Sequence, residues 1–466
     1  MLKRLRIQNF KGWIDTGDID LAPITVLFGS NSSGKSSIGQ FLVMLKQSVQ
    51  QQDRRTVFLL SGEQASVNLG TPEDIFYFHN TDNDISFDYL WNMGEKNSFS
   101  ISGEKKTYDT LRFSGRVGVQ NEKAPYLNVK KFLYQLYKGD VKQLSVGMKQ
   151  ENKGRQSDGK YVLLNEGIEL KRNRGRAWKL SDPIKFYGFP DTAMAYYQDS
   201  DFLQDLSLQQ EVLFSHFFYL GPLRSKSKRI YSWTGANPES VGDDGSLVIQ
   251  SILSARHLGR KLQFKPGGKN MEFEEVIGKA LKKMELVEDY RIKQIENRQD
   301  YEVKVKIKGT GNYVSLPDVG FGVSQVLPVV VQLFYAPDDS IIFIEQPEIH
   351  LHPKAQSLLA DIIVDAVNMR EKAKRKRLQL IIETHSEYLL RRLQMRVSDE
   401  TLAINELKAY FIVNRNRHSE LNKLNVDSYG NILNWPEGFF GDMEEDMYKQ
   451  AMNALKRRMQ EETDNG

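Results

Sequence analysis

The sequence predicts an α/β fold in which one parallel sheet is assembled from two separate parts of the chain. Residues 24–28 form a short apolar run that enters a glycine- and serine-rich loop, and apolar residues at helical spacing follow over 37–50. Two later apolar runs, 341–344 and 378–382, have the length of buried strands. Each is followed at once by polar residues, as at the carboxyl edge of a parallel sheet.

Composition indicates a folded globular protein. Of 466 residues, 27% are charged and 40% hydrophobic, and the formal net charge of +4 neither demands nor excludes a nucleic-acid partner. The chain has 0 cysteines, which excludes a disulfide framework and thiolate metal sites and fits the cytoplasm. No apolar run approaches the roughly 20 residues of a membrane span. We therefore expect a soluble protein without membrane contact.

The chain divides into four predicted parts. Residues 1–123 hold the first half of the core and, over 85–119, short alternating pieces typical of an antiparallel accessory sheet. Residues 124–295 are expected to be an insertion with mobile parts and a helical lobe. The lobe would be formed by the apolar and aromatic segment 202–223 and the helix candidates 245–262 and 273–286. The alternating run 301–307 is expected to return the chain to a sheet. The second half of the core is then 296–420, and 421–466 is a tail with a charged helix over 443–460.

The glycine- and serine-rich loop fits the Walker A pattern for binding ATP. Backbone N–H groups of such a loop surround the β-phosphate at a helix N-terminus, the lysine reaches the β- and γ-phosphates, and the hydroxyl beside it binds Mg²⁺. The nucleotide-binding residues predicted here are Gly29, Ser30, Asn31, Ser32, Ser33, Gly34, Lys35, Ser36 and Ser37. Ser36 is the predicted magnesium ligand among them.

A second motif supplies the acid that such a loop requires. The run 341–344 ends in Glu345, a carboxylate placed to hold Mg²⁺ directly or through water. Gln346 and Glu348 follow within three positions and are candidates for orienting or activating the attacking water. Glu345 is therefore both a catalytic and a metal candidate.

Two further motifs point to phosphate contacts. Gly322, Ser324 and Gln325 open an apolar helix, so free N–H groups at its start can meet a phosphate. Because the chain already has one phosphate loop, this second helix start is expected to cap the γ-phosphate of ATP bound to another subunit. His385 follows the strand 378–382 within the sequence Glu383-Thr384-His385-Ser386 and is placed to contact the γ-phosphate.

With these four motifs in this order, the chain resembles ABC-type ATPases of the SMC, RecF and OLD branch. The opening LKRLRIQNFKGW and the phrase IEQPEIHLHPKAQ are similar to bacterial RecF- and OLD-like ATPases of phage-defence systems. YLGPLRSKSKRIYSW at 219–233 and NWPEGFF at 434–440 also look like a widespread bacterial ATPase group. The resemblance implies an ABC-type P-loop core split in sequence, with ATP held between two copies of the chain.

The chain departs from that family at two positions. Gly322 stands where the signature usually has its serine, and Gln346 stands where the catalytic glutamate is usual. Glutamine cannot accept a proton but can orient water, and Glu348 is an alternative base. We therefore expect slow or partner-stimulated ATP hydrolysis.

Several residues keep more than one interpretation. His350 and His352 alternate as a metal pair would, but no third ligand is evident, and the resemblance implies a dimer-interface loop instead. His79 is structural or lies near a magnesium-sensing loop. The basic runs 171–176 and 372–377 are solvated surface or contacts for DNA phosphates.

The function predicted from these features is an ATP-hydrolysing switch of an anti-phage defence system. It would sense DNA or a phage component and control a separate effector such as a nuclease, because the residues after His385 contain no spaced pair of acids for a nuclease of its own. The alternative is a RecF- or SMC-like DNA-maintenance clamp without an effector. A transporter ATPase is a weaker third interpretation.

Overall fold

A six-stranded sheet carries the residues of all four motifs at one edge or beside it. The computed structural model describes residues 1–94, 98–101, 103–120, 126–151, 160–175, 179–307, 309, 311–436 and 448–455. The sheet has the order β12-β19-β22-β4-β23-β24, and all neighbours are parallel except β23 and β24. Its strands are β4 (Ile24–Gly29), β12 (Phe217–Leu220), β19 (Ser340–Glu345), β22 (Leu378–Thr384), β23 (Leu407–Arg415) and β24 (His418–Leu424). The predicted parallel sheet, assembled from both ends of the chain, is confirmed.

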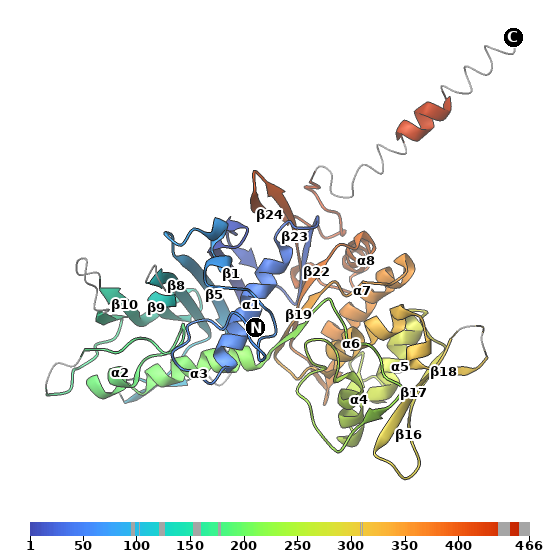
Figure 1. Cartoon of the computed structure of the whole chain (residues 1–466), viewed down its shortest axis with the longest axis horizontal. Helices are drawn as coiled ribbons and strands as arrows, with labels where there is room; N and C mark the ends of the chain where they lie inside the picture. Colours follow the sequence, from blue (N-terminus) through green and yellow to red (C-terminus); the bar gives the residue numbers. More distant parts are fainter. Residues whose placement is uncertain are drawn as a thin grey trace.

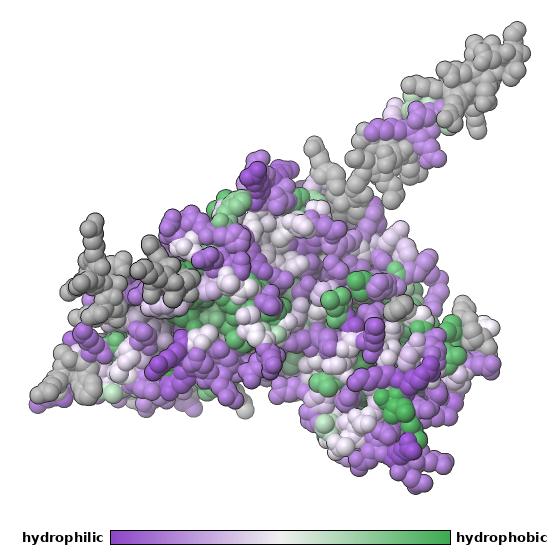
Figure 2. All heavy atoms as spheres, viewed as in Figure 1, coloured by the Kyte–Doolittle hydropathy of each residue, from purple (hydrophilic) through white to green (hydrophobic). Residues whose placement is uncertain are grey.

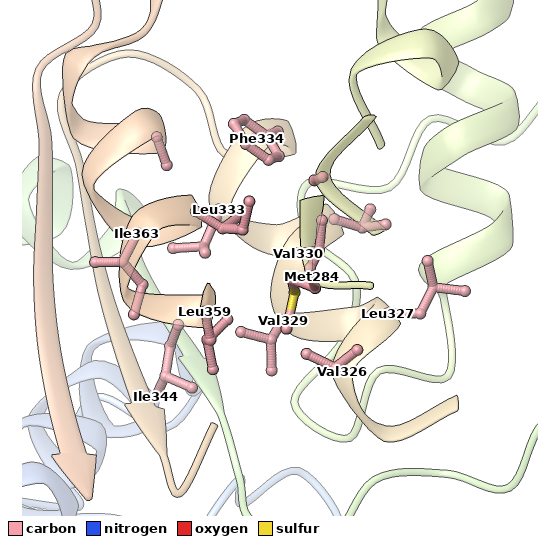
Figure 3. Close-up of a cluster of buried hydrophobic side chains, with 14 of the residues drawn as sticks. Met284, Val326, Leu327, Val329, Val330, Leu333, Phe334, Ile344, Leu359 and Ile363 are labelled. Carbon is pink, nitrogen blue, oxygen red and sulfur yellow. The ribbon is translucent and has the colours of Figure 1, made fainter. Parts of the chain in front are cut away.

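The central strands are continuous apolar runs because helices cover both of their faces. Ile342 and Ile344 of β19 belong to one core cluster, while Ile341 and Phe343 belong to another on the opposite face. Figure 1 shows helix α1 on one side of the sheet and α6, α7 and α8 on the other. Figure 3 shows the core that contains Ile342 and Ile344, where Ile344 of the sheet packs toward α6 and α7. The helices are α1 (Lys35–Gln50), α6 (Phe321–Tyr335), α7 (Pro353–Asn368) and α8 (Glu387–Ser398).

An antiparallel sheet forms the second large layer. Its order is β11-β10-β9-β8-β5-β1-β2, with β3 also paired to β1. The strands are β1 (Leu2–Phe10), β2 (Trp13–Asp15), β3 (Ile19–Asp20), β5 (Ile85–Asn92), β8 (Thr110–Gln120), β9 (Tyr126–Lys138), β10 (Val141–Glu151) and β11 (Lys160–Glu166). A hairpin of β6 (Ser98–Ile101) and β7 (Glu104–Thr107), and the short helix α2 (Asp191–Tyr196), complete this half of the molecule.

The expected boundary at residue 123 falls inside this antiparallel sheet. β8 and β9 pair along their whole length, and β10 and β11 extend the same sheet, so residues 126–151 and 160–166 are mostly strand rather than a loose insertion. The alternation that shows this is in β9, where Phe132, Tyr134 and Leu136 are buried and the residues between them are only partly buried. Part of the predicted insertion, 152–159 and 176–178, lies outside the described residues.

The prediction that the segment 202–223 belongs to the helical lobe was wrong. Helix α3 (Phe202–Ser215) shares the core cluster of the antiparallel sheet, because Phe202, Leu206 and Phe214 bury there. β12 then enters the parallel sheet beside β19. This segment therefore connects the two layers and ends at the carboxyl edge of the parallel sheet.

The lobe contains the two predicted helices and two small sheets. The helices are α4 (Val248–His257) and α5 (Phe273–Lys283). One sheet joins β13 (Tyr231–Ser232), β16 (Asp289–Gln294), β17 (Asp300–Lys306) and β18 (Tyr313–Ser315); the other joins β14 (Lys261–Gln263), β15 (Met271–Glu272), β20 (Arg370–Glu371) and β21 (Lys374–Arg375). The run 301–307 returns the chain to a sheet, as predicted: it forms β17, which pairs with strands of the lobe, so the predicted second half of the core, 296–420, begins inside the lobe.

The remaining predictions concern the tail and the surface. Residues 448–455 are helical, and the rest of the predicted tail helix over 443–460 lies outside the described residues. In Figure 2 hydrophilic side chains cover most of the visible face and hydrophobic ones form small groups among them. Of the helices that the structure describes, none combines the length and apolar character that crossing a bilayer requires.

Candidate nucleotide site

The loop between β4 and α1 can be formed only with glycine at two positions. Gly29 has φ 154° and Gly34, the residue before α1, has φ 98°. A Cβ at Gly29 would lie 2.1 Å from the Ile412 carbonyl oxygen, and one at Gly34 would lie 2.3 Å from Ser419 Oγ. β23 and β24 therefore pack closely against the loop, and this packing fixes the path of the loop at the carboxyl end of β4.

The lysine of the loop lies inside it. Lys35 Nζ donates to the carbonyl oxygens of Gly29 at 2.9 Å and Ser30 at 2.6 Å, and its side chain is 3% exposed. Burial lowers the pKa of Lys35, while Glu383 and Glu348 favour its charged form. The positive charge is thus held at the centre of the loop, where the Walker A pattern places it.

The other predicted loop residues divide by exposure. Ser30, Asn31 and Ser32 are exposed, whereas Ser33 is buried. The Ser37 hydroxyl, also buried, accepts a 2.9 Å hydrogen bond from Trp13 Nε1, which also donates to the Gly34 carbonyl. The tip of the loop is therefore exposed to solvent, while the buried indole of Trp13 holds the end of the loop that leads into α1.

The hydroxyl predicted to bind magnesium contacts a carboxylate. Ser36 Oγ donates to Glu383 Oε1 at 2.7 Å, and Glu383 Oε2 is buried with no hydrogen-bond partner. The sequence prediction paired Ser36 with Glu345 and gave Glu383 no role. The two glutamates are register partners at the ends of the adjacent strands β19 and β22, and both strands read as apolar runs ending in glutamate. That shared ending is the signal from which Glu383 could have been predicted.

Glu345 is held by the segment that follows β12. Tyr219 Oη donates to Glu345 Oε1 at 2.8 Å, and Arg224 Nη2 donates to the Glu345 carbonyl oxygen at 2.9 Å. Burial and the nearby charge of Glu383 raise the pKa of Glu345 to about 7, against the opposing effects of Tyr219, Arg224 and Lys11. Neither Tyr219 nor Arg224 was predicted to belong to the site.

The candidates for activating water also meet at this edge. Gln346 has φ 45°, uncommon for a residue other than glycine, and its N–H donates to the Glu383 carbonyl at 2.8 Å. Glu348 Oε1 accepts from the His385 backbone N–H at 2.8 Å, and its Oε2 is buried without a partner. Burial raises the pKa of Glu348. The structure thus brings Glu345, Gln346, Glu348 and His385 together, as predicted.

The imidazole of His385 lies beside the phosphate loop. Partial burial, together with the charge of Lys35, lowers its pKa, and a hydrogen bond with the Gly29 backbone acts in the opposite direction. His385 is therefore favoured as a neutral side chain near Lys35. His385 begins the segment between β22 and α8, and Ser386 in this segment caps the N-terminus of α8.

The predicted signature residues lie at the same edge but beside a different loop. Gly322 packs near the segment after β19, where an added Cβ would be 3.3 Å from the His350 carbonyl oxygen. Val326, one turn into α6, and Ile344 lie toward the same end of the cluster in Figure 3. The sheet order places β22 between β19 and β4, so the segment after β19 that Gly322 approaches lies two strands away from the strand that carries the Lys35 loop of the same chain.

The alternative interpretations of other residues receive less support. His352 caps α7, its Nδ1 accepting from the Lys354 N–H at 3.3 Å, and no group of three metal-ligating side chains occurs among the described residues. His79 is exposed, and its ring approaches Asp74 rather than the site acids. In the run 372–377, Lys376 is buried at the amino end of β22, away from the nucleotide edge. Of 171–176, the described residues 171–175 are exposed.

The residues present fit a magnesium ion. A hydroxyl, two buried carboxylates at matched strand ends and an unpartnered carboxylate oxygen form an oxygen donor set of the kind that Mg²⁺ prefers. Burial and, after it, the charge of Glu383 raise the pKa of Glu345, and a divalent cation held by these residues would favour the charged carboxylates. The ion would supply charge neutralisation for phosphate transfer to water.

A parallel sheet with a glycine-fixed phosphate loop, a buried lysine and strand-end acids defines a P-loop ATPase. The chain matches the model of the AAA ATPase domain over residues 1–161 and 264–390, more than half of its length, and it belongs to this family. The match is split in sequence, as the fold is. Residues 404–450 match a second model, described as a protein of unknown function (DUF3696). The comparison with curated proteins found no match.

Solved structures similar to this chain include three SMC head domains. One is a head bound to the C-winged helix domain of ScpA, which is 12% identical to this chain. The match covers 92% of this chain and 98% of that head, with a TM-score of 0.45. The head from Thermotoga maritima is 9% identical with coverages of 91% and 99% and a TM-score of 0.39. One derived from Pyrococcus furiosus, bound to the C-terminal domain of ScpA, is 10% identical with coverages of 98% and 99% and a TM-score of 0.45. These values describe a distant likeness.

Proposed function

We propose that this protein is an ATP-driven switch whose two nucleotide sites form between two copies of the chain. The observation that carries the proposal is the separation, by two strands of one sheet, between the segment that Gly322 approaches and the strand that carries the phosphate loop. In a symmetric pair, Gly322, Ser324 and Gln325 of one copy would meet the γ-phosphate held by Lys35 of the other.

The residues around Lys35 would divide the work of hydrolysis. Ser36, Glu383 and Glu345 would hold Mg²⁺, and His385 would contact the γ-phosphate as a neutral donor. Glu348, with one unpartnered carboxylate oxygen, is the candidate base for the attacking water.

Slow or partner-stimulated turnover is part of the proposal. Gln346 occupies the position after Glu345 and cannot accept a proton, so it can only orient water. Glu348 has its other oxygen bound to the His385 N–H, which limits how freely it can turn toward a water molecule. A partner that shifts the 346–350 loop would therefore change the rate.

For the biological role, we infer a defence-associated switch that senses DNA or a phage component and controls a separate effector such as a nuclease. The support is the similarity of the phrase IEQPEIHLHPKAQ and of the chain's opening to ATPases of such systems. The alternative is a DNA-maintenance clamp that acts without an effector.

The experiment is ATP turnover of the purified protein and of Lys35→Ala, alone and with duplex or single-stranded DNA. DNA-stimulated turnover that is lost in the variant supports a DNA sensor or clamp. Turnover that requires Lys35 but ignores DNA supports a protein trigger. Turnover that is unchanged in Lys35→Ala contradicts the nucleotide site itself.

A further inference from the structure

The segment Tyr219 to Arg224, reading YLGPLR, adjoins the nucleotide edge and contacts Glu345, but the proposed division of work in hydrolysis gives it no part. β12 pairs in parallel with β19, with Tyr219 opposite Phe343 and Leu220 opposite Ile344. The next residues of both strands leave the sheet at the same edge. The loop after β12 therefore runs directly beside Glu345.

Arg224 is a buried cation whose hydrogen bonds go to backbone oxygens. Its side chain is 7% exposed, with Nη1 donating to the Pro222 carbonyl at 2.7 Å and Nη2 to the Glu345 carbonyl at 2.9 Å. Its Nε is buried without a partner. Burying a guanidinium without a bonded carboxylate costs free energy, so its retention here calls for a compensating charge nearby.

That compensating charge is the acid cluster of the site. Glu345 and Glu348 are the acids that act on Arg224, and both are more than nine-tenths buried. Glu383 adds a third buried carboxylate. Two lysines oppose the negative charge of these acids: Lys35 from the phosphate loop and Lys11 from the loop after β1. Arg224 thus adds a further cation to this cluster, from the loop after β12.

Tyr219 holds the carboxylate of the same glutamate whose main chain Arg224 holds. Its ring stacks on Phe343 at 5.7 Å between centroids and an interplanar angle of 15°, and this stacking fixes the direction of the hydroxyl that donates to Glu345 Oε1. One loop thereby fixes Glu345 at two points. Glu345 then has little freedom to swing away from the metal position.

We propose that Tyr219 and Arg224 are positioning residues of the ATPase site, Tyr219 by orienting the Glu345 carboxylate and Arg224 by holding its main chain and balancing the acid cluster. The inference rests on the proposed ATPase function and deepens it. Loss of either residue weakens the response to Mg²⁺ and the turnover step more than it weakens binding of the nucleotide itself.

The test compares Arg224→Met, Arg224→Lys and Tyr219→Phe with wild type. Arg229→Met is the matched control, because Arg229 lies on the same loop but is exposed and paired with Asp318. Three quantities are measured: kcat and KM for ATP, the Mg²⁺ concentration for half-maximal turnover, and affinity for a fluorescent ATP analogue in EDTA and in Mg²⁺. Melting temperatures identify any variant that fails to fold.

We expect Arg224→Met to lower kcat by about 10- to 100-fold while analogue affinity in EDTA changes less than about threefold. Arg224→Lys should recover part of the loss because it keeps the charge, and Tyr219→Phe should raise the Mg²⁺ requirement several-fold. If Arg224→Met does not fold, the other two variants decide. Folded variants with wild-type kcat and Mg²⁺ requirement would overturn the inference alone, whereas a wild-type protein that neither binds nor hydrolyses ATP would overturn the proposed function.

Discussion

Ser36 Oγ donates a 2.7 Å hydrogen bond to Glu383 Oε1, which joins the first turn of α1 to the carboxyl end of β22. The bond joins the two halves of the ATPase core, because the two residues lie 347 positions apart in sequence. Since β22 lies between β19 and β4, Glu383 is the strand-end acid nearest to the phosphate loop in the sheet. Glu345 lies one strand further away.

Glu383→Gln tests whether this acid belongs to the magnesium site. Removing the charge while keeping the shape should raise the Mg²⁺ concentration for half-maximal ATP turnover by about 10- to 100-fold. Glu345→Gln should have an effect of the same kind, and the larger of the two identifies the more direct ligand. The measurement is a Mg²⁺ titration of turnover, with Glu387→Gln at the start of α8 as control. A wild-type titration curve for Glu383→Gln would exclude it from the site.

Gly39 of α1 tests how closely the helix after the phosphate loop must approach the sheet. A Cβ at Gly39 would lie 1.8 Å from Phe343 Cζ, so Gly39→Ala forces α1 and β19 apart. We expect the free energy of unfolding to fall by about 1–3 kcal/mol, measured by denaturant titration. Phe343→Leu in the same chain should restore part of it by making room.

The control for Gly39 is Gly320→Ala. An added methyl at Gly320 meets no atom within 4 Å, and its backbone is not in the left-handed region. Its stability should stay within about 0.5 kcal/mol of wild type. If both alanine variants lose stability equally, close approach of α1 to Phe343 is not the cause.

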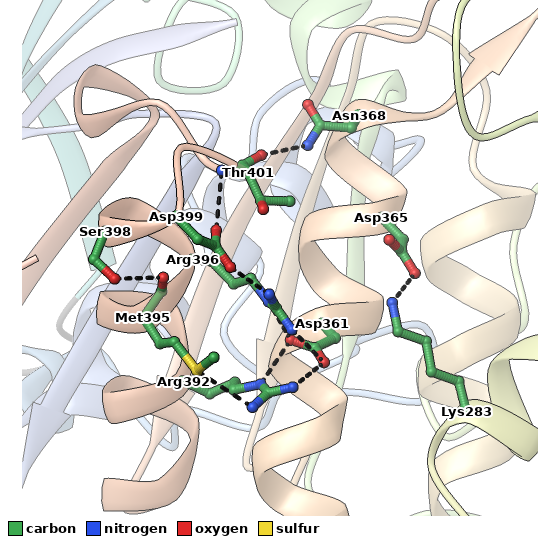
Figure 4. A network of polar contacts seen from close by, with 10 residues as sticks. All are labelled: Lys283, Asp361, Asp365, Asn368, Arg392, Met395, Arg396, Ser398, Asp399 and Thr401. Carbon is green, nitrogen blue, oxygen red and sulfur yellow. Dashed lines mark hydrogen bonds and ion pairs between the residues drawn. The ribbon is translucent and has the colours of Figure 1, made fainter.

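Asp361 connects the helices that follow Glu345 and His385. It lies on α7, is 3% exposed, and accepts hydrogen bonds from Arg392 and Arg396 of α8, as Figure 4 shows. Asp361→Asn leaves the partly buried guanidinium of Arg392 without a carboxylate and that of Arg396 with Asp399 alone. The expected loss in the free energy of unfolding is about 3–5 kcal/mol at neutral pH.

The same network predicts a pH dependence with a definite sign. Burial alone would raise the pKa of Asp361, but the two arginines lower it to about 2, below the ordinary value of 3.8. A depressed pKa contributes stability that is present above the unfolded value and is lost as pH falls toward the folded one. The stability difference between wild type and Asp361→Asn should therefore shrink between about pH 4 and pH 2. A difference independent of pH over that range contradicts the ion-pair account.

The sequence predicted the local parts of the site better than their partners. The loop 29–36 and the buried strands ending at Glu345 and near His385 follow from local pattern alone, because phosphate binding and two-sided burial each leave a short signature. The position of β17 in a lobe sheet did not follow. Its alternation shows that one face is buried but not which strand lies beside it, since pairing is decided by distant segments.

Glu383 and Arg224 were missed for a related reason. A glutamate at the end of an apolar run is a weak signal, and an arginine two residues after a proline is an ordinary surface residue in sequence. The roles of Glu383 and Arg224 become clear when the register places Glu383 opposite Glu345 and when β12 is the neighbour of β19. The sequence alone predicted that ATP is held between two copies of the chain, because one chain carries two helix N-termini suited to binding phosphate. This prediction is the central claim to test.

The most direct test of that claim is complementation between two inactive variants. Lys35→Ala disables the phosphate loop and Ser324→Arg blocks the signature, so each protein alone should be nearly inactive. A mixed pair has one site built from an intact loop and an intact signature, and we predict that mixing the two proteins restores a substantial fraction of wild-type ATP turnover. If the mixture stays as inactive as its components, or if Ser324→Arg alone is fully active, ATP is not held between two copies and the account is wrong.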